Sequence, residues 1–379
     1  MILNIFQDNA FFLQSAIKCF NAADIPSEYA VFSKKAFGKQ LHNEKDNVFY
    51  YKISTEEYNN FIKTIPDKNY KLILFHSLFD TNAYVAKQII KKNKNHPPLA
   101  WYIYGSEIDN AFLFPGRYFG KLTKKIYYKQ KPYRIIIPFQ RIIKRICGND
   151  LKNVINNIDY FVHFIPEEIK FAEKELGIKK TSLWFIYDWL EDIIGKDFLN
   201  EKVEKNESIL IGNSSSYNLN TMEVFSFLSK AKINKKILVP LSYGNKLYRN
   251  YILKKGRSLF NSNFSPLLEL MPLSEYNKFL ASCSFLIINS YKQQALGNIN
   301  FAALYGAKVF LNDYTSTYIY LKKIGVKIFS IQDLQNNLND ELFTALSDEE
   351  ANSNRKILMD ALGKEKVIKM IKESFADFI

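Results

Sequence analysis

Small polar residues follow an apolar, strand-like run at residues 208–211 and precede a helix-like stretch that begins near Asn220. The loop starts with Gly212, Asn213 and Ser214. Residues this small leave main-chain N–H groups accessible at the start of the helix, where the helix dipole adds partial positive charge. The pattern favours a phosphate site, and the alternative is an ordinary strand–helix loop with a Ser or Asn cap.

A second polar loop, residues 289–300, also lies between a buried strand and a helix. Its candidate ligands are Lys292, Gln293 and Gln294, followed by Gly297 and Asn298 at the expected helix start. Both loops follow strands in the same half of the chain, so we expect them at the carboxyl edge of one parallel sheet, where open α/β folds bind ligands. Taken alone, the second loop is also typical of a polar surface loop. Together the two loops predict a diphosphate site.

Ionisable side chains stand at two strand ends in the first half of the chain. His76 directly follows the apolar run 72–75, and Glu107 and Asp109 follow the run 99–104. A carboxylate or imidazole at such a position could act as a general base on an acceptor hydroxyl. The alternatives are a hydrogen-bonded structural histidine and a pair of helix-capping acids.

Residues 110–149, here called the basic segment, hold ten cations and no acidic residue, with aromatic residues spread among the cations. Its candidate membrane-binding cations are Arg117, Lys121, Lys124, Lys125, Lys129, Arg134, Arg141, Lys144 and Arg145. The mixture is typical of an amphipathic segment on an anionic bilayer, at about 1 kcal/mol per cation near the surface. Nucleic acid is an alternative partner, but no RNP, KH or helix-turn-helix pattern supports it. A solvated basic face is the third interpretation.

The motifs that the sequence lacks exclude several chemistries. There is no GxGxxG and no GxxxxGK[ST], which argues against a dinucleotide oxidoreductase and a P-loop NTPase. The four histidines lack metal-ligand spacing, and no Asp-x-Asp pair is present. Sugar-nucleotide chemistry would therefore neutralise a diphosphate without a metal, through N–H groups, helix N-termini and cationic side chains. We expect no metal and no cofactor.

The elements that must position these groups form two successive series of short apolar runs and amphipathic stretches. In the first half the expected strands are 2–6, 48–53, 71–75, 99–104, 159–164 and 182–186. In the second half they are 208–211, 236–240, 268–270, 285–288, 308–311 and 327–330. Helix-length stretches lie between many of them, and residues 349–378 are expected to form terminal helices. The pattern predicts two doubly wound α/β domains with parallel sheets, 1–195 and 196–379.

Length and composition agree with this organisation. The 379 residues suggest two domains at roughly 100–200 residues each. The net charge of +14 favours a polyanionic partner or an anionic membrane surface, and the basic segment alone supplies +10. No run of about 18 uncharged apolar residues is present, and no basic region precedes the apolar N-terminal residues. We therefore expect an intracellular protein that is soluble or peripheral to a membrane.

The same segments resemble a known family, the bacterial 4-acetamido-4,6-dideoxy-galactosyltransferases of the enterobacterial common antigen pathway (glycosyltransferase family 56). The similarity is carried by FHSLFDTN at 75–82, WYIYGSEI at 101–108, ILIGNSSSYNLN at 209–220, ILVPLSYGNKLYRNYI at 237–252 and the QQxxG element at 293–297. It extends over residues 70–335, most of the chain.

This resemblance implies the GT-B fold, in which two Rossmann-like domains enclose an active site in the cleft between them. Members are inverting, metal-independent transferases that move an amino-deoxy sugar from a thymidine diphosphate donor to an undecaprenyl-diphosphate-linked saccharide. By the resemblance, the residues near the diphosphate would be Gly212, Asn213, Ser214, Gln293, Gln294 and Gly297, and Tyr243 and Gly244 would shape the same pocket. Glu107 stands where the family has an acid, so it is the first candidate base, with His76 the second.

The sequence therefore predicts a GT-B glycosyltransferase of surface polysaccharide synthesis, peripheral on the cytoplasmic face of the inner membrane. We expect it to bind a nucleoside-diphosphate sugar, a lipid-linked acceptor and anionic lipid, but no nucleic acid. The alternatives are a GT-B transferase with a different donor or a soluble acceptor, and a non-enzymatic polyanion-binding protein.

Overall fold

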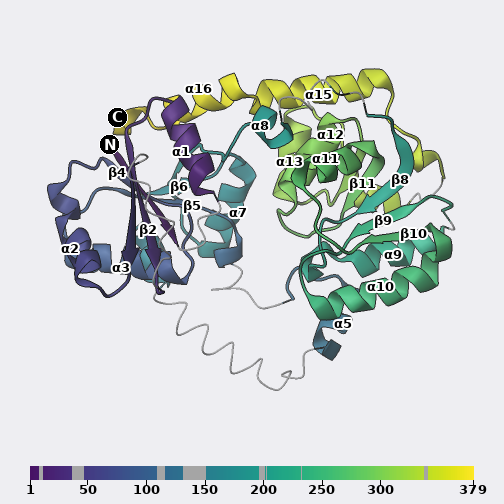
Figure 1. Cartoon of the computed structure of the whole chain (residues 1–379), viewed down its shortest axis with the longest axis horizontal. Helices are drawn as coiled ribbons and strands as arrows, with labels where there is room; N and C mark the ends of the chain where they lie inside the picture. Colours follow the sequence, from purple (N-terminus) through teal and green to yellow (C-terminus); the bar gives the residue numbers. More distant parts are fainter. Residues whose placement is uncertain are drawn as a thin grey trace. The chain divides into compact units, whose positions relative to one another are not determined.

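The computed structural model describes residues 1–7, 12–35, 47–108, 116–130, 151–195, 201, 203–231, 233–336 and 340–379. The chain divides into two compact units (Figure 1). Unit 1 consists of Met1–Phe114, Pro138–Trp189 and Lys364–Ile379, and unit 2 consists of Pro115–Ile137 and Leu190–Gly363. Each unit is built around one parallel β-sheet.

The sheet of unit 1 has seven strands in the order β3-β2-β1-β4-β5-β6-β7. They are β1 (Ile2–Gln7), β2 (Ser27–Ser33), β3 (Val48–Lys52), β4 (Leu72–Phe75), β5 (Leu99–Tyr102), β6 (Tyr160–Val162) and β7 (Thr181–Leu183). Central strand β1 pairs in parallel with β2 on one side and β4 on the other. Such central strands carry buried, mostly apolar residues because helices cover both faces of the sheet. The strand order reverses between β1 and β4, which makes this the switch point of the sheet.

The helices of unit 1 whose bounds lie within the described residues are α1 (Leu13–Ala22), α2 (Glu56–Thr64), α3 (Asp80–Lys92), α7 (Pro166–Leu176) and α16 (Lys364–Ser374). Two of them, α2 and α7, have clear local start or stop signals. Thr55 begins α2 because its side chain accepts a hydrogen bond from the Tyr58 N–H. Pro166 occupies the first turn of α7, and Gly177 ends that helix in the left-handed conformation.

The sheet of unit 2 has six strands in the order β10-β9-β8-β11-β12-β13. They are β8 (Asn206–Ile211), β9 (Ile237–Pro240), β10 (Phe264–Leu267), β11 (Cys283–Ile288), β12 (Lys308–Leu311) and β13 (Phe329–Ser330). Strand β8 pairs in parallel with both β9 and β11. The order reverses between β8 and β11, so the switch point of this sheet lies there.

The helices of unit 2 flank both faces of its sheet. They are α5 (Lys121–Gln130), α8 (Leu190–Ile194), α9 (Thr221–Lys230), α10 (Lys246–Phe260), α11 (Leu273–Ser282), α12 (Leu296–Leu304), α13 (Ser316–Lys323), α14 (Ile331–Asn336) and α15 (Asp348–Leu362). Figure 1 shows α9 and α10 on one side of the sheet and α11, α12 and α13 on the other. Helix α15 starts with a capping box formed by Ser347 and Glu350.

Two helices belong to the opposite unit from the one that their half of the sequence mainly forms. Helix α5 packs against α9 and α10, and its Ile126 and Tyr127 are part of the core of unit 2. Helix α16 packs against α1 in unit 1, with Ile371 fully buried and Phe375 in edge contact with Phe20 at 5.4 Å. The units therefore differ from the predicted division 1–195 and 196–379, because these helices bury their apolar faces in the other core.

The predicted fold class is confirmed, since both units are doubly wound α/β structures with parallel sheets. One predicted strand, 268–270, is wrong: the strand is Phe264–Leu267, and Leu268 and Leu270 are 42% and 75% exposed. Strand β2 was not predicted from the sequence. Among the described residues, no helix has the length and apolarity that crossing a bilayer requires.

Candidate functional site

The carboxyl edges of the two sheets gather the residues that the sequence singles out. In unit 2, the loops that follow β8 and β11 lie next to each other at the switch point of the sheet. In unit 1, His76 directly follows β4 at the equivalent switch point, and Glu107 lies beyond the end of neighbouring β5. Open α/β sheets bind ligands at these positions.

The loop after β8 is joined to its neighbours by main-chain hydrogen bonds. It turns at Gly212, whose φ of +69° favours glycine, and the Gly212 N–H donates to the main-chain oxygen of Ile287 in β11 (2.9 Å). The Ser215 N–H donates to the main-chain oxygen of Tyr243 (2.9 Å), and Ser215 also pairs with Gly244 in a parallel bridge. A β-carbon at Gly244 would lie 2.6 Å from Ser215 Oγ, so the close approach of the two loops requires glycine there. The structure thus brings together the predicted loops at 212–214 and 243–244.

Tyr243 presents an aromatic surface at this edge. Its side chain is 51% exposed, and its hydroxyl accepts a hydrogen bond from Asn213 Nδ2 (3.1 Å), while Ser214 beside it is buried. Partial burial raises the pKa of Tyr243, so the hydroxyl stays protonated at neutral pH. Nearby, Asn298 Nδ2 in α12 donates to the hydroxyl of Tyr276 in α11 (2.5 Å).

The loop after β11 leads into a helix N-terminus that no side chain caps. Ala295 precedes α12 in a left-handed conformation (φ +59°), and the helix begins at Leu296, one residue before the predicted start. The preceding ligand candidates Lys292, Gln293 and Gln294 are half-buried. Gly297 in the first turn is exposed, and a β-carbon there would meet no atom within 4 Å. The N-terminus of α12 thus has no side-chain cap and has open space beside Gly297, an arrangement that suits an anion.

A relay of amide side chains, those of Asn220, Asn289 and Asn312 buried and that of Gln332 partly so, holds four strand ends of unit 2 in place. Asn220 Nδ2 donates to the main-chain oxygen of Asn289 (3.0 Å), and Asn312 Nδ2 donates to Asn289 Oδ1 (2.9 Å). Gln332 Nε2 donates in turn to Asn312 Oδ1 (2.8 Å). The relay runs across the loops that follow β8, β11, β12 and β13. Buried polar networks whose members are satisfied fix a single geometry, and here they fix that of the candidate phosphate loops.

Residues 117–120 of the basic segment lie at this same edge of unit 2. Asn220 Nδ2 also donates to the main-chain oxygen of Tyr118 (3.0 Å), and Asn220 Oδ1 accepts from the Gly120 N–H (2.7 Å). The Arg117 guanidinium and the Lys292 ammonium each lie 5.7 Å from the centre of the Tyr118 ring. Arg117, predicted as part of a membrane patch, is therefore next to the loop that carries Lys292.

The other described cations of the basic segment lie on α5. Lys121, Lys124, Lys125 and Lys129 are all exposed on that helix. The remaining predicted patch residues, Arg134, Arg141, Lys144 and Arg145, lie outside the described residues.

In unit 1, His76 is buried with both ring nitrogens engaged. Nε2 is 2.9 Å from Asn4 Oδ1, and Nδ1 is 2.6 Å from the Tyr187 hydroxyl. Because an amide oxygen only accepts, Nε2 carries the proton and the Tyr187 hydroxyl donates to Nδ1. Burial lowers the pKa of His76 well below its usual value, so the ring is neutral. With no free nitrogen, His76 is placed to orient Tyr187 rather than to take a proton from a ligand.

Glu107 is the buried carboxyl group of this edge. It is 2% exposed, and its Oε1 accepts weak hydrogen bonds from the Leu78 N–H (3.4 Å) and Trp101 Nε1 (3.5 Å). Its Oε2 has no hydrogen-bond partner among the described residues. Desolvation raises the pKa of Glu107 to about 7, against 4.5 for an ordinary glutamate. A carboxyl group with this pKa exchanges protons near neutral pH, as a general base must. Asp109, the third candidate, lies outside the described residues.

Aromatic rings that the sequence did not single out lie around these two groups. Tyr187, which follows β7, stacks with Tyr104, which follows β5, with their ring centroids 6.2 Å apart. The ring of Phe12 stacks on Tyr187 and Tyr104 at 4.5 and 5.8 Å, and Tyr102 lies 4.7 Å from Tyr187. Only the position of Tyr104 and Tyr187 after apolar strands could have indicated them in advance.

The sequence matches no protein-family model and no curated protein sequence. The structure, in contrast, is similar to solved glycosyltransferase structures over the whole chain. Anabaena HepE in complex with UDP and glucose aligns with a TM-score of 0.62 at 12% identity, covering 99% of this chain and 100% of that chain. A glycosyltransferase from Rickettsia africae (TM-score 0.59, 9% identity) and sucrose-phosphate synthase from Thermosynechococcus elongatus (0.60, 9%) each cover 99% of this chain and have 98% of their own length aligned. The architecture shared over these lengths, two doubly wound α/β units, shows that the chain has the GT-B fold.

Proposed function

We propose that the protein is an inverting glycosyltransferase that takes a sugar from a nucleoside diphosphate bound by unit 2. The observation that carries this proposal is the uncapped N-terminus of α12 at the switch point of the sheet, with the Gly212 loop beside it. Arg117 and Lys292, on the shared ring of Tyr118, supply positive charge for the diphosphate at the same edge. The neighbour HepE, solved with UDP and with UDP-glucose, supports a nucleotide-sugar donor.

The donor groups are arranged for a diphosphate that carries no protein-bound metal. The N–H groups of Asn213 and Ser214 and those of the first turn of α12 bind its oxygens. The two cations neutralise the charge that grows as the diphosphate departs. By the family resemblance, the donor would consist of thymidine diphosphate and an amino-deoxy sugar. A GT-B transferase with another donor would use the same loops.

Glu107 is the proposed general base of a single in-line displacement. The acceptor oxygen attacks the anomeric carbon, and the bond between that carbon and the diphosphate oxygen breaks. The proton of the acceptor hydroxyl passes to the Glu107 carboxylate. The nucleoside diphosphate leaves with the electron pair of the broken bond, and the anomeric configuration is inverted. Because Oε2 of Glu107 has no partner among the described residues, it is the oxygen available for this proton.

The proposed acceptor is a saccharide linked to undecaprenyl diphosphate at the cytoplasmic face of the inner membrane. This follows from the family resemblance and from the cations of the basic segment, which suit an anionic membrane surface. A soluble acceptor is the alternative within the same reaction class. A non-enzymatic polyanion-binding protein is the alternative outside it.

A screen of nucleoside diphosphates by thermal shift tests the donor site, because a ligand at 100 times its Kd stabilises a protein by about 2.7 kcal/mol. Nucleotide-sugars that stabilise the protein would then be incubated with lipid-linked and soluble saccharide acceptors, and products detected by mass spectrometry. Stabilisation by a nucleoside diphosphate but not by the nucleoside, with a glycosylated product, would support the proposal. If no nucleoside diphosphate binds, the polyanion-binding alternative is favoured.

A further inference from the structure

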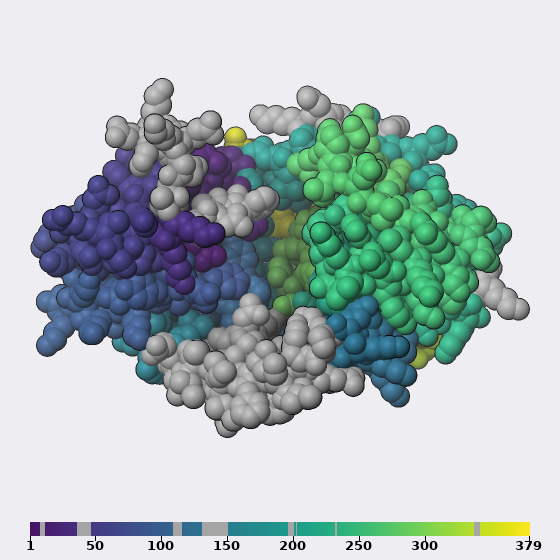
Figure 2. Space-filling view, turned by 60° about the horizontal axis from the view of Figure 1, so that its bottom comes forward, coloured from purple at the N-terminus to yellow at the C-terminus, as the bar shows by residue number. Residues whose placement is uncertain are grey.

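Helices α5 and α10 lie side by side on the outside of unit 2, where they form what we call the α5–α10 surface. Gln130 Nε2 in α5 donates to the main-chain oxygen of Leu247 in α10 (3.2 Å). The hydroxyls of Thr123 in α5 and Tyr248 in α10 lie 3.2 Å apart. In Figure 2 the blue atoms of α5 adjoin the green atoms of unit 2 on one exposed face. The two helices are far apart in the sequence, yet they present one continuous surface.

The α5–α10 surface carries a dense, unneutralised positive charge. Its cations are Lys121, Lys124, Lys125 and Lys129 on α5 and Lys246, Arg249, Lys254, Lys255 and Arg257 on α10. Neither helix contains an acidic residue. Within the described part of the chain, none of these cations takes part in an ion pair. A folded protein that leaves so many neighbouring cations unpaired gains nothing in stability from them, so an external anionic partner is the natural counterpart.

Exposed leucines lie among these cations. Leu122, Leu247 and Leu259 are 37%, 54% and 39% exposed, whereas Ile126 and Ile252 on the opposite faces of the helices are buried in the core of unit 2. The helices therefore cannot turn their main apolar faces outward without unfolding the unit. They can meet a partner only with cations and with these few leucines.

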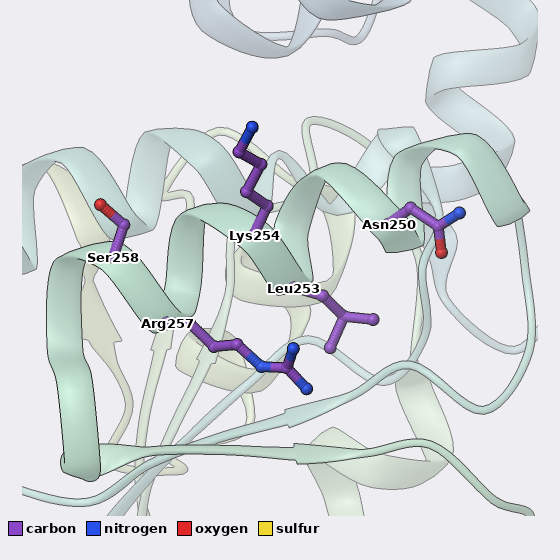
Figure 3. Close-up of a pocket in the computed structure, with 5 residues that line it drawn as sticks. All are labelled: Asn250, Leu253, Lys254, Arg257 and Ser258. Carbon is purple, nitrogen blue, oxygen red and sulfur yellow. The ribbon is translucent and has the colours of Figure 1, made fainter.

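Part of α10 is hollowed in a way that suits a small anionic group. A hollow of about 570 Å³ is lined by Asn250, Leu253, Lys254, Arg257 and Ser258 (Figure 3). The spacing of these residues puts them on one face of α10, and in the close-up Lys254 lies at one edge of that face and Leu253 and Arg257 at the other. Two cations with two neutral polar side chains and one leucine provide the contacts that a phosphate head group with attached acyl chains would use.

We propose that the α5–α10 surface docks the protein on an anionic phospholipid bilayer, with unit 2 as the docking unit. The leucines favour a bilayer over nucleic acid, because apolar side chains gain free energy at the boundary between head groups and acyl chains. Neither helix has an exposed aromatic ring on which bases could stack. The choice of a lipid partner rests on the proposed function, which places the acceptor in a membrane. The surface also extends beyond the basic segment, because more than half of its cations come from α10.

The test measures co-sedimentation of the full chain with phosphatidylcholine vesicles, with and without phosphatidylglycerol, at low and high salt. The variant K254A/K255A/R257A removes three cations of α10, and its matched control K91A/K92A/K94A removes three exposed lysines of unit 1. At about 1 kcal/mol per cation, the α10 variant should bind phosphatidylglycerol vesicles about 10²-fold more weakly, and the control should bind like the parent protein. Melting temperature and nucleoside-diphosphate binding, measured without vesicles, should be the same for all three proteins.

Three results would overturn the docking surface: no preference for phosphatidylglycerol, equal weakening by both variants, or displacement of the vesicles by an equal charge of single-stranded DNA. These results differ from failure of the proposed function, which would appear as absence of nucleoside-diphosphate binding by the parent protein. A protein that binds nucleoside diphosphates but not anionic vesicles would refute only the docking surface.

Discussion

Asn220 donates a hydrogen bond of 3.0 Å from its side-chain Nδ2 to the main-chain oxygen of Asn289, which joins the loop after β8 to the end of β11. Both residues are buried, and the same amide group of Asn220 also contacts the main chain of Tyr118 and Gly120. One side chain therefore sets the spacing of three segments at the proposed donor site.

Replacing Asn220 by glycine should weaken both the fold and donor binding. Asn220 has a φ of +48°, which glycine adopts freely, so the variant removes only the side-chain hydrogen bonds. Loss of these bonds should lower the free energy of unfolding by about 2–3 kcal/mol. Urea denaturation measures this change, and calorimetry with a nucleoside diphosphate measures the loss of affinity. An unchanged affinity in the folded variant would show that the relay does not position the donor loops.

Two glycine substitutions should separate donor binding from stability. Gly297→Ala places a methyl group where no atom lies within 4 Å, so it should leave stability unchanged but obstruct an anion at the first turn of α12. Gly244→Ala forces a β-carbon against Ser215 at a φ of +112°, so it should lower the melting temperature. Thermal melts with and without a nucleoside diphosphate distinguish the two. If Gly297→Ala binds the nucleoside diphosphate as tightly as the parent protein, the diphosphate does not bind at the first turn of α12.

Arg117→Ala should weaken nucleoside-diphosphate binding about 10- to 100-fold, the effect of losing one hydrogen bond to a charged group. Lys121→Ala is the matched control, because Lys121 is an exposed cation four residues further along the chain. Calorimetric titration of both variants provides the comparison. If the two variants bind the nucleoside diphosphate equally well, Arg117 does not belong to the donor site, and the prediction that it is part of the membrane patch is favoured.

Glu107→Gln should lower turnover by about 10²–10⁴, the contribution of a general base, with little change in donor affinity. Glutamine keeps an oxygen for the Leu78 N–H and Trp101 Nε1, so the variant should fold normally. Steady-state kinetics on the acceptor identified by product detection would measure the effect. Full retention of activity would eliminate Glu107 as the base and direct attention to Asp109, because both ring nitrogens of His76 are engaged.

The raised pKa of Glu107 also predicts two opposite pH dependences. Activity should increase with pH and level off above about 7, since only the carboxylate accepts a proton. Stability should change the other way, because the folded protein holds this proton more tightly than the unfolded chain does. The resulting stabilisation is complete below pH 4.5 and is lost as the pH rises through about 7. It amounts to about 3 kcal/mol. The difference in unfolding free energy between the parent and Glu107→Gln, followed from pH 4 to about 8 by urea denaturation, should show this loss; a flat difference would contradict it.

Most of the fold could be predicted from the sequence, because parallel strands buried on both faces read as short apolar runs between amphipathic helices. Strand β2 was missed although it contains the buried apolar run Tyr29–Phe32, because polar Ser27, Glu28 and Ser33 flank that short run. The strand predicted at 268–270 was wrong because a short apolar stretch can be an exposed loop as well as a buried strand, and Leu268 and Leu270 are exposed. Sequence order also does not reveal which core receives a helix, so the membership of α5 and α16 had to come from the structure.

The candidate site was predictable where single loops carry a signal and not where distant residues meet. The loops at 212–214 and 292–298 stand out through small and polar residues after strands. The partners of His76, by contrast, are separated from it by 72 and 111 residues, and no local pattern links them. The relay that starts at Asn220 likewise exists only once four strand ends lie side by side.

The distribution of the chain between its two units has a consequence for engineering. The chain passes from one unit to the other at 114/115, 137/138, 189/190 and 363/364. A chimaera that exchanges the donor-binding unit with that of another GT-B enzyme at a single crossover would leave unit 1 without α16 or replace it by a foreign helix. In a recombinant of such enzymes, residues 364–379 should therefore come from the same parent as the rest of unit 1. Residues 115–137 should come from the same parent as the rest of unit 2.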